Sequence, residues 1–137
     1  MNQTDLKKNY DLALLLLRIG VGLIFVVAGW GKLNGIEGVA GFFGGLGIPL
    51  PGIMAWVVAC VEFFGGLMVL TGTYTRYAAP FLAFVMLTAL LTTKLGGEFS
   101  AARLDLMLLL TASALIILGS GKYSVDSMVL DKRGASV

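Results

Sequence analysis

Four long apolar segments dominate the chain, and each contains or adjoins single charged residues. A helix needs about 20 apolar residues to cross about 30 Å of hydrocarbon. The segments therefore predict membrane spans at 12–32, 53–71, 77–95 and 102–118. The first is longer than the about 7 to 15 apolar residues of a signal-peptide core, and Arg18 interrupts it. We therefore expect it to be a retained span.

The overall composition agrees with a membrane location. Of 137 residues, 58% are hydrophobic and 13% are charged, and the mean hydropathy is +0.91. This leaves too little polar surface to cover a soluble globule of this size. The connection at 72–76 is short enough to make its flanking spans antiparallel. The prediction is an all-α fold with a single domain over residues 1–137, an integral membrane four-helix bundle in up-down order.

The positions of the basic residues predict the orientation, because Lys and Arg are enriched in cytoplasmic loops. With the amino terminus inside, the outer side carries Lys32, Lys94 and Arg103. The inner side then carries the larger basic set, which is Lys7, Lys8, Arg76, Lys122, Lys132 and Arg133. Both termini are therefore predicted to be cytoplasmic.

Several kinds of site cannot be built from this composition. The chain has no histidine and a single cysteine, Cys60. A haem held by His, a copper site, a His-bearing zinc site, a CxxC pair and an intrachain disulfide are therefore excluded for this chain alone. The net charge is +2 and no basic run exceeds a pair, which argues against nucleic acid as a partner. We predict no metal and no intrinsic cofactor.

The longest connection, residues 34–52, is rich in glycine. Four apolar residues within it recur at helical spacing and would share one face, and these are Val39, Phe42, Phe43 and Leu46. The segment is either a helical turn in the membrane interface or a re-entrant lid over a pocket among the spans. Two prolines, Pro49 and Pro51, then end any helix and redirect the chain.

Glu62 lies near the centre of the second apolar segment. A carboxylate at the middle of a bilayer costs about 2.5 kcal/mol or more, so such a residue is a candidate functional site. At about 1.5 Å per residue, Arg18 and Glu62 would differ in depth by about 5 Å, which an arginine side chain can bridge. Asp105 enters from the start of the fourth span. The sequence thus predicts a polar intramembrane cluster of Arg18, Glu62 and Asp105.

Helical spacing places these charges among small residues, which let membrane helices approach closely. The three predicted inward faces are Arg18, Gly22, Phe25, Gly29 and Lys32; Ala55, Ala59, Glu62, Gly66 and Val69; and Asp105, Leu109, Ala112, Ile116 and Gly119. The expected helix-packing positions within them are Gly22, Gly29, Ala59 and Gly66.

The predicted cluster has a structural and a functional interpretation. In the structural one, an Arg18–Glu62 pair only fixes helix register, and Asp105 caps a helix start. In the functional one, the cluster binds a quinone, because the headgroup carbonyls need donors and quinone reduction needs protons. A buried carboxylate also suits proton relay.

Three functions are consistent with these residues. In the first, the chain is a quinone-associated subunit, and a partner supplies the electrons because the chain has no redox centre of its own. It would then be at most a subunit of a membrane oxidoreductase. In the second, it is a structural or assembly subunit that packs its small-residue faces against other membrane helices. In the third, it is a small oligomeric transporter whose pathway is lined by Arg18, Glu62 and Asp105.

Four sequence runs, in order, resemble the DoxX family of bacterial inner-membrane proteins. They are LLLRIGVGLIFVVAGWGKL at 15–33, a loop ending in GIPLPG, VEFFGGLMVLTGTYTRYAA at 61–79 and LDLMLLLTASALIILGSGKYSVD at 104–126. The most specific pieces are the Arg and Gly-x-Gly-Lys of the first span, the Glu-x-x-Gly-Gly of the second and the closing Gly-x-Gly-x-Tyr-Ser-x-Asp.

The resemblance implies a multi-pass protein of a bacterial or archaeal cytoplasmic (inner) membrane, in a family often described as oxidoreductase or quinone-linked subunits. Relatives include the small subunit of an archaeal thiosulfate:quinone oxidoreductase, and a mycobacterial member associates with a superoxide dismutase and a sulfurtransferase. The implied partners are the lipid bilayer and other membrane or peripheral subunits, or further copies of the chain. The implied ligand is a bound quinone.

The resemblance also marks individual positions. Those that match the family pattern are Arg18, Lys32, Glu62, Arg76, Asp105, Tyr123 and Asp126. Many members carry a histidine near the end of the third span, where this chain has Lys94. That departure weakens any proton-transfer or metal role at this position.

Overall fold

The computed structural model describes residues 2–91, 99–119, 121, 123–125 and 128. Within these ranges the secondary structure is helical, so the all-α prediction is confirmed there. The helices are α1 (Gln3–Asn34), α2 (Ile36–Gly45), α3 (Pro51–Thr71), α4 (Thr75–Ala89) and α5 (Phe99–Leu118).

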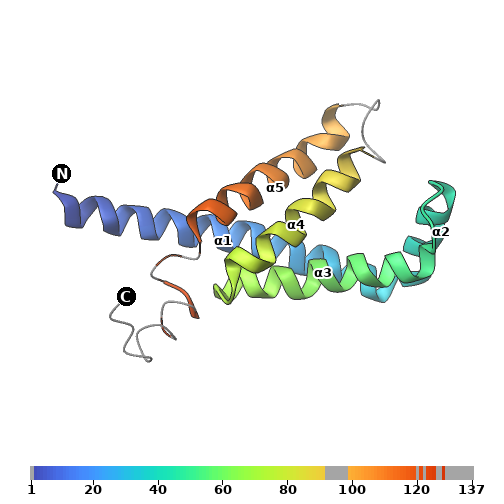
Figure 1. The fold of residues 1–137 in the computed structure, drawn as a ribbon, viewed down its shortest axis with the longest axis horizontal. Helices are drawn as coiled ribbons and strands as arrows, with labels where there is room; N and C mark the ends of the chain where they lie inside the picture. Colours follow the sequence, from blue (N-terminus) through green and yellow to red (C-terminus); the bar gives the residue numbers. More distant parts are fainter. Residues whose placement is uncertain (1, 92–98, 120, 122, 126–127, 129–137) are drawn as a thin grey trace.

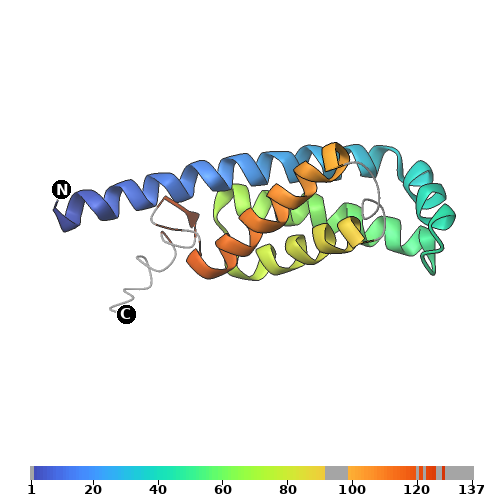
Figure 2. The same cartoon turned by 90° about the horizontal axis from the view of Figure 1, so that it is seen from above.

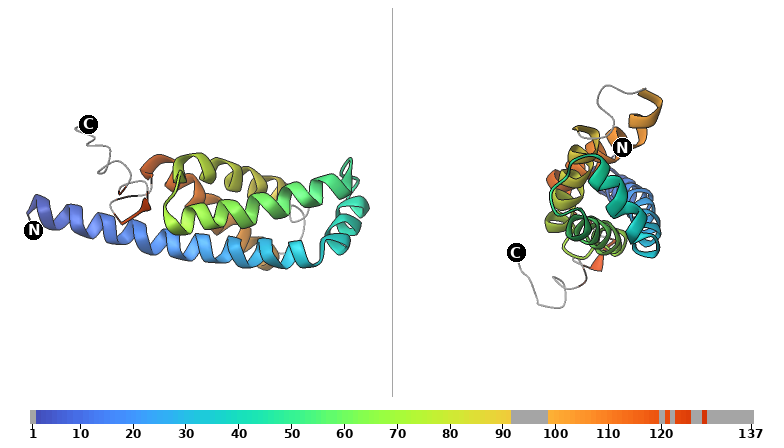
Figure 3. Two further views of the ribbon diagram at one scale, coloured as in Figure 1. Left: turned by 90° about the horizontal axis from the view of Figure 1, so that it is seen from below. Right: turned by 90° about the vertical axis from the view of Figure 1, so that its right-hand side faces the viewer.

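The four longer helices lie side by side and run in alternating directions, and α2 crosses one end of them (Figure 1). α1 packs mainly on α3, and α4 mainly on α5. Contacts of α3 with α4 and of α1 with α5 join the two pairs, and α2 rests on α3. The first turns of α1 project beyond the other helices (Figure 2), and the end-on view shows α2 over the end of the assembly (Figure 3).

Two helices of the described part, α1 and α3, are long and apolar enough to cross a membrane. α3 reproduces the predicted span 53–71 to within two residues. α1 begins nine residues before the predicted span, because Asn2 caps it there by accepting a hydrogen bond from the Asp5 N–H at 2.9 Å. α4 ends at Ala89, and residues 92–95 of the predicted span 77–95 lie outside the described residues.

The long connection contains the predicted helix. α2 occupies Ile36–Gly45, and Pro51 stands in the first turn of α3, where its missing N–H would have had no partner in the helix. The chain therefore turns back between the two helices within a few residues. This turn holds α2 across the end of α1 and α3.

Glycines bring α1 and α3 into backbone contact. A Cβ atom on Gly29 would meet the backbone of Phe63, with the Phe63 Cα at 2.7 Å. A Cβ atom on Gly22 would lie 2.8 Å from the Leu70 nitrogen, and one on Gly66 would lie 2.8 Å from the Val26 nitrogen. Only hydrogen side chains fit at such distances. These contacts set the axial register of the antiparallel pair.

The predicted inward faces of α1 and α3 are the ones that pack. Every predicted position on the α3 face is buried, Ala59 included, and on α1 only Lys32 remains half-exposed. The face of α5 differs from the prediction: Ala112 and Gly119 are buried, whereas Asp105, Leu109 and Ile116 are half-buried. The buried residues of α5 include Leu108 and Leu115, because this helix packs mainly on α4.

Candidate functional site

A largely apolar cavity of about 1240 Å³ lies at the end of the molecule that α2 covers. Each of the helices α1 to α5 contributes to its wall. The described charged residues in the wall are Lys32 from the last turn of α1, Glu62 from the middle of α3 and Asp105 from the second turn of α5. The remainder of the wall is mainly aliphatic and aromatic.

An ion pair between α1 and α3 forms the polar part of this wall. The Lys32 Nζ donates a hydrogen bond of 2.6 Å to Glu62 Oε2. The Glu62 side chain is 2% exposed and that of Lys32 is 30% exposed. Asp105 is half-buried and close enough to act electrostatically on Glu62. The structure therefore brings Glu62 and Asp105 near each other, and Lys32 is the cation paired with Glu62.

Arg18 lies elsewhere, and the predicted Arg18–Glu62 pair is not formed. Both terminal nitrogens of Arg18 donate to the carbonyl oxygen of Tyr123, at 2.9 and 2.8 Å. A Cβ atom on Gly72 would lie 2.9 Å from the Arg18 Nη1. Gly72 and Glu62 are ten residues apart, about 15 Å along α3.

The predicted Arg18–Glu62 pair was wrong because the prediction assumed a different axial register of α1 against α3. The predicted depths assumed that α1 and α3 start and end at the same levels. The register is set instead by the contacts of Gly22 and Gly29 with α3. These contacts place Glu62 opposite the last turns of α1, so that Lys32 and not Arg18 meets its carboxylate.

The remaining predicted residues lie apart from the cavity. Tyr123 accepts the two hydrogen bonds of Arg18 through its carbonyl group. Arg76 is exposed, and its Nη2 donates to the Ile117 carbonyl oxygen at 3.5 Å. Lys94 and Asp126 lie outside the described residues. The Arg18–Tyr123 contact therefore holds the segment that follows α5, whereas Arg76 contacts the last turn of α5, and neither Tyr123 nor Arg76 lines the cavity.

One buried charge was missed in the sequence. Asp11 is only 7% exposed and lies on the same face of α1 as Leu14 and Arg18. The spacing of three and four residues from Asp11 through Leu14 to Arg18 would have identified it. It was overlooked because the predicted span began at residue 12.

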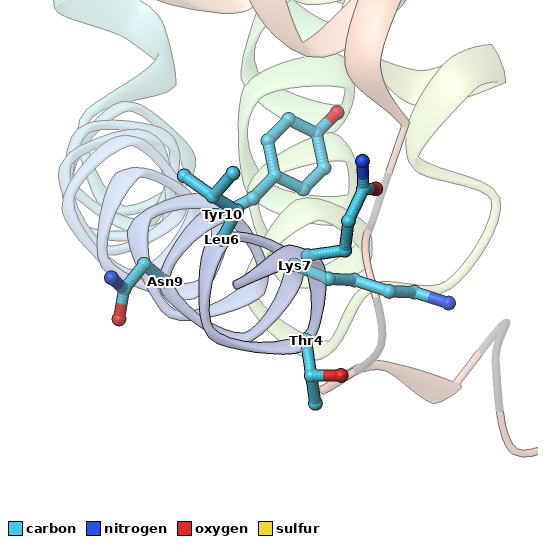
Figure 4. A pocket seen from close by; sticks show the side chains of 6 residues that line it. Thr4, Leu6, Lys7, Asn9 and Tyr10 are labelled. Atoms are coloured by element: carbon cyan, nitrogen blue, oxygen red, sulfur yellow. The ribbon is translucent and has the colours of Figure 1, made fainter. Parts of the chain in front are cut away.

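A second hollow lies on the first turns of α1 (Figure 4). Its lining side chains are exposed and come from this one helix, namely Gln3, Thr4, Leu6, Lys7, Asn9 and Tyr10. A surface that gathers no buried side chain lacks the enclosed apolar wall of a ligand pocket. The cavity beneath α2 is therefore the candidate site.

Comparison with known proteins agrees with the helical, apolar character of the chain. The DoxX family model matches residues 13–95. The protein named "Putative oxidoreductase CatD" of Bacillus subtilis (strain 168) is 38% identical over 125 residues, which cover 90% of this chain and 92% of that protein. Inner membrane protein YqjF of Escherichia coli (strain K12) is 37% identical over 134 residues, covering 93% of this chain and 99% of that protein.

No solved structure matches the chain. The family model covers more than half of the sequence, and each of these two relatives aligns over nearly its whole length. The chain therefore belongs to the DoxX family, and its Escherichia coli relative YqjF is named as an inner membrane protein.

Proposed function

We propose that this chain is a multi-pass inner-membrane protein that binds a quinone-type redox carrier in its cavity and works with a partner protein that exchanges electrons with that carrier. In this proposal α1, α3, α4 and α5 cross the membrane as a four-helix bundle with both termini in the cytoplasm. The observation that carries it is an apolar cavity of about 1240 Å³ whose wall contains the Lys32–Glu62 ion pair and Asp105.

The cavity suits a molecule with a small polar ring and a long apolar tail. Its volume of about 1240 Å³ exceeds the about 300 to 1,000 Å³ of typical ligand pockets, which leaves room for a ring and part of a tail. Lys32 can donate hydrogen bonds to a ring oxygen and Glu62 can accept them. A quinone, when bound, can take up two electrons and two protons, and the residues of this chain would bind and orient its ring.

The rim of the cavity suggests how a lipid-soluble ligand reaches it. Phe42 of α2 and Phe81 and Phe84 of α4 belong to its wall, yet they are 56%, 64% and 69% exposed. α2 packs on α3 and α4 packs mainly on α5, and we propose that the carrier enters through an opening between α2 and α4, beside these exposed rings. In a bilayer that opening would face hydrocarbon, and a carrier could enter without crossing water.

The structure changes the roles that the sequence suggested for the charged residues. Arg18 donates to the Tyr123 carbonyl, so in this proposal Lys32, and not Arg18, is the cation at the headgroup. The name of the Bacillus relative contains the word oxidoreductase, which agrees with a redox association for this chain.

A tryptophan at Val57 is expected to weaken binding of a decyl-substituted benzoquinone about tenfold. Val57 lines the cavity but is 47% exposed, so a larger ring can enter the cavity without displacing the core. Excluding about 60 Å² of apolar ligand surface costs about 1.5 kcal/mol, which is about tenfold in affinity. Calorimetric titration of the purified protein in lipid nanodiscs measures this.

The matched control is Val27→Trp. Val27 is an exposed residue of α1 outside the cavity, so this variant should bind as the unchanged protein does. Equal affinities for the two tryptophan variants would contradict binding in the cavity.

The alternative function is that of an assembly subunit without a ligand. In that hypothesis the small-residue faces pack against helices of other proteins. Gly22, Gly29 and Gly66 are instead buried in the α1–α3 contact of this chain, so they offer no surface to a partner. This observation favours the ligand-binding proposal.

Glu62→Gln separates the two functions. Glutamine keeps the side-chain shape and an oxygen for the Lys32 hydrogen bond, so the free energy of unfolding should change by only about 1 kcal/mol, and association with other subunits should persist. Loss of the charge should change carrier affinity about tenfold. Native mass spectrometry of gently extracted protein follows both the association with other subunits and the bound carrier. Glu37→Gln, an exposed change outside the cavity, is the control. If Glu62→Gln fails to assemble and the unchanged protein carries no ligand, the alternative of an assembly subunit would be supported.

A further inference from the structure

We infer that α2 is a lid of the cavity, that it opens by separating from α3 and unfolding, and that a bound carrier holds it closed. The inference rests on the proposed function and concerns how the same cavity admits its ligand. It follows from three properties of α2, namely its attachment to the other helices, its own helix stability and the position of its apolar face.

The attachment of α2 is apolar. The helix packs on α3, yet none of its ten residues is buried. Within the part of the chain that the structure describes, no hydrogen bond or ion pair joins a side chain of α2 to another helix. The half-buried residues share one face and are Ile36, Val39, Ala40 and Phe43. The lid is therefore held closed by the packing of this face.

α2 is also a weak helix by itself. Four of its ten residues are glycine, and its amino-terminal cap, Gly35, makes no side-chain hydrogen bond. Glycine is the least favourable residue of a helix interior after proline, and isolated helices shorter than about 12 residues are marginal in water. At the end of the proposed spans, water can bond to the backbone groups that unfolding releases. Once separated from α3, α2 should therefore lose its helical structure.

The apolar face of α2 belongs to the cavity wall. Val39 and Phe43 line the cavity and are half-buried, so a ligand inside covers them with further apolar surface, which is favourable. An open lid gives up this contact. A ligand that binds the closed state better than the open one shifts the equilibrium toward closure. α2 also forms one side of the proposed entrance, so its opening widens the path of the carrier.

The test measures amide hydrogen exchange of the full chain in lipid nanodiscs, with and without a decyl-substituted benzoquinone. Without the probe, α2 should exchange at least about tenfold faster than residues 57–62 of α3, which contribute to the same wall. If the probe binds only the closed state, opening falls by the factor 1 + [L]/Kd, so free probe at about 100 times its Kd should slow α2 exchange about 100-fold. Residues 3–10 of α1, outside the cavity, should exchange as before.

Two exchange results would overturn the lid and leave the proposed function standing. One is α2 exchange that stays the same while calorimetric titration of the same sample shows the probe bound. The other is α2 exchange as slow as that of residues 57–62 in the ligand-free protein. Failure of the probe to bind would instead overturn the proposed function, and the inference with it.

Gly41→Ala tests the opening step by kinetics. Gly41 lies in α2 outside the cavity, and nothing lies within 4 Å of an added Cβ atom. Alanine therefore favours the closed, helical lid by up to about fivefold without touching the ligand. The association and dissociation rate constants of the probe should both fall about threefold to fivefold. The Kd should stay within about twofold, because the free and the bound closed states gain equally. Stopped-flow quenching of tryptophan fluorescence by the quinone follows both rates.

Gly20→Ala is the matched control. Gly20 lies in α1 outside the cavity, and an added Cβ atom again meets nothing within 4 Å. This variant should leave both rate constants unchanged. If Gly41→Ala leaves them unchanged as well, α2 does not open for the ligand and the inference is wrong.

Discussion

Gly29→Ala is expected to destabilise the protein by about 3 kcal/mol or more, the upper end of the cost of inserting atoms into a packed interior. The added methyl group would meet the backbone of Phe63, whose Cα atom lies 2.7 Å from the position of the new Cβ. A backbone cannot move aside as the end of a side chain can. The α1–α3 pair must therefore separate or shift. Thermal unfolding of the purified protein in detergent, followed by circular dichroism, measures the loss.

Gly31→Ala is the matched control for this prediction. It adds the same methyl group two residues later in α1, where nothing lies within 4 Å of the new Cβ. Alanine forms helices better than glycine by up to about 1 kcal/mol, so this variant should be at least as stable as the unchanged protein. If both alanine variants unfold at the same temperature, α1 and α3 do not approach as closely as described.

Arg18→Met is expected to destabilise the protein by about 3 kcal/mol, the upper end of the contribution of a hydrogen bond to a charged group. Arg18 is 1% exposed and donates to the Tyr123 carbonyl through two nitrogens. Methionine fills a similar volume without donors, so the carbonyl loses both of its Arg18 bonds. Hydrogen exchange at Ser124 and Val125 should then accelerate as this segment leaves α1.

Two further variants sharpen the result. The free energy of unfolding of Arg18→Lys should lie between those of Arg18→Met and the unchanged protein, because an ammonium cannot reproduce the planar pair of donors. Arg103→Met removes an exposed arginine of α5 and should change the free energy of unfolding by no more than about 0.5 kcal/mol. Unchanged exchange at Ser124 in Arg18→Met would show that Arg18 does not hold this segment in place.

Arg18 and the cavity are predicted to be energetically separate. The guanidinium lies beside Gly72, ten residues from Glu62 along the chain, and distant sites without shared partners contribute additively to stability. The Arg18 variants should thus keep the ligand affinity of the cavity wherever they fold. A subunit that used Arg18 at the headgroup would not behave this way.

Much of the architecture was predictable because its signals are local. The apolar lengths of α1 and α3 and the glycine-to-proline pattern after α2 are read directly from neighbouring residues. The periodic small residues on α1 and α3 also predicted which faces pack, since helical spacing brings residues three and four apart to one side. The four membrane crossings and their orientation remain predictions of the sequence.

Asp11 and Lys32 show where local signals were misread. Asp11 continues the buried face of α1, but it precedes the apolar segment and was left outside the predicted span. Lys32 closes the same face and was predicted on it, although its position at the end of the segment also placed it among the basic residues of the outer side. In the structure it bonds to Glu62 at 2.6 Å. For Asp11, the start of the helix had been confused with the start of the apolar run.

The sequence by itself determined the helices, their packing faces and the presence of charges within apolar segments, because each of these depends on residues close together in the chain. Only the tertiary structure decided which charges meet. That choice depends on the axial register of α1 against α3, which the backbone contacts of Gly22, Gly29 and Gly66 determine. Arg18 lies about 15 Å from Glu62 along α3 where about 5 Å was predicted, and this difference of about two helical turns exchanged the partner of the buried carboxylate. For the cavity, the spacing within residues 34–52 predicted a helical segment and left open whether it covers a pocket, and only the packing of α2 on α3 placed it in the cavity wall.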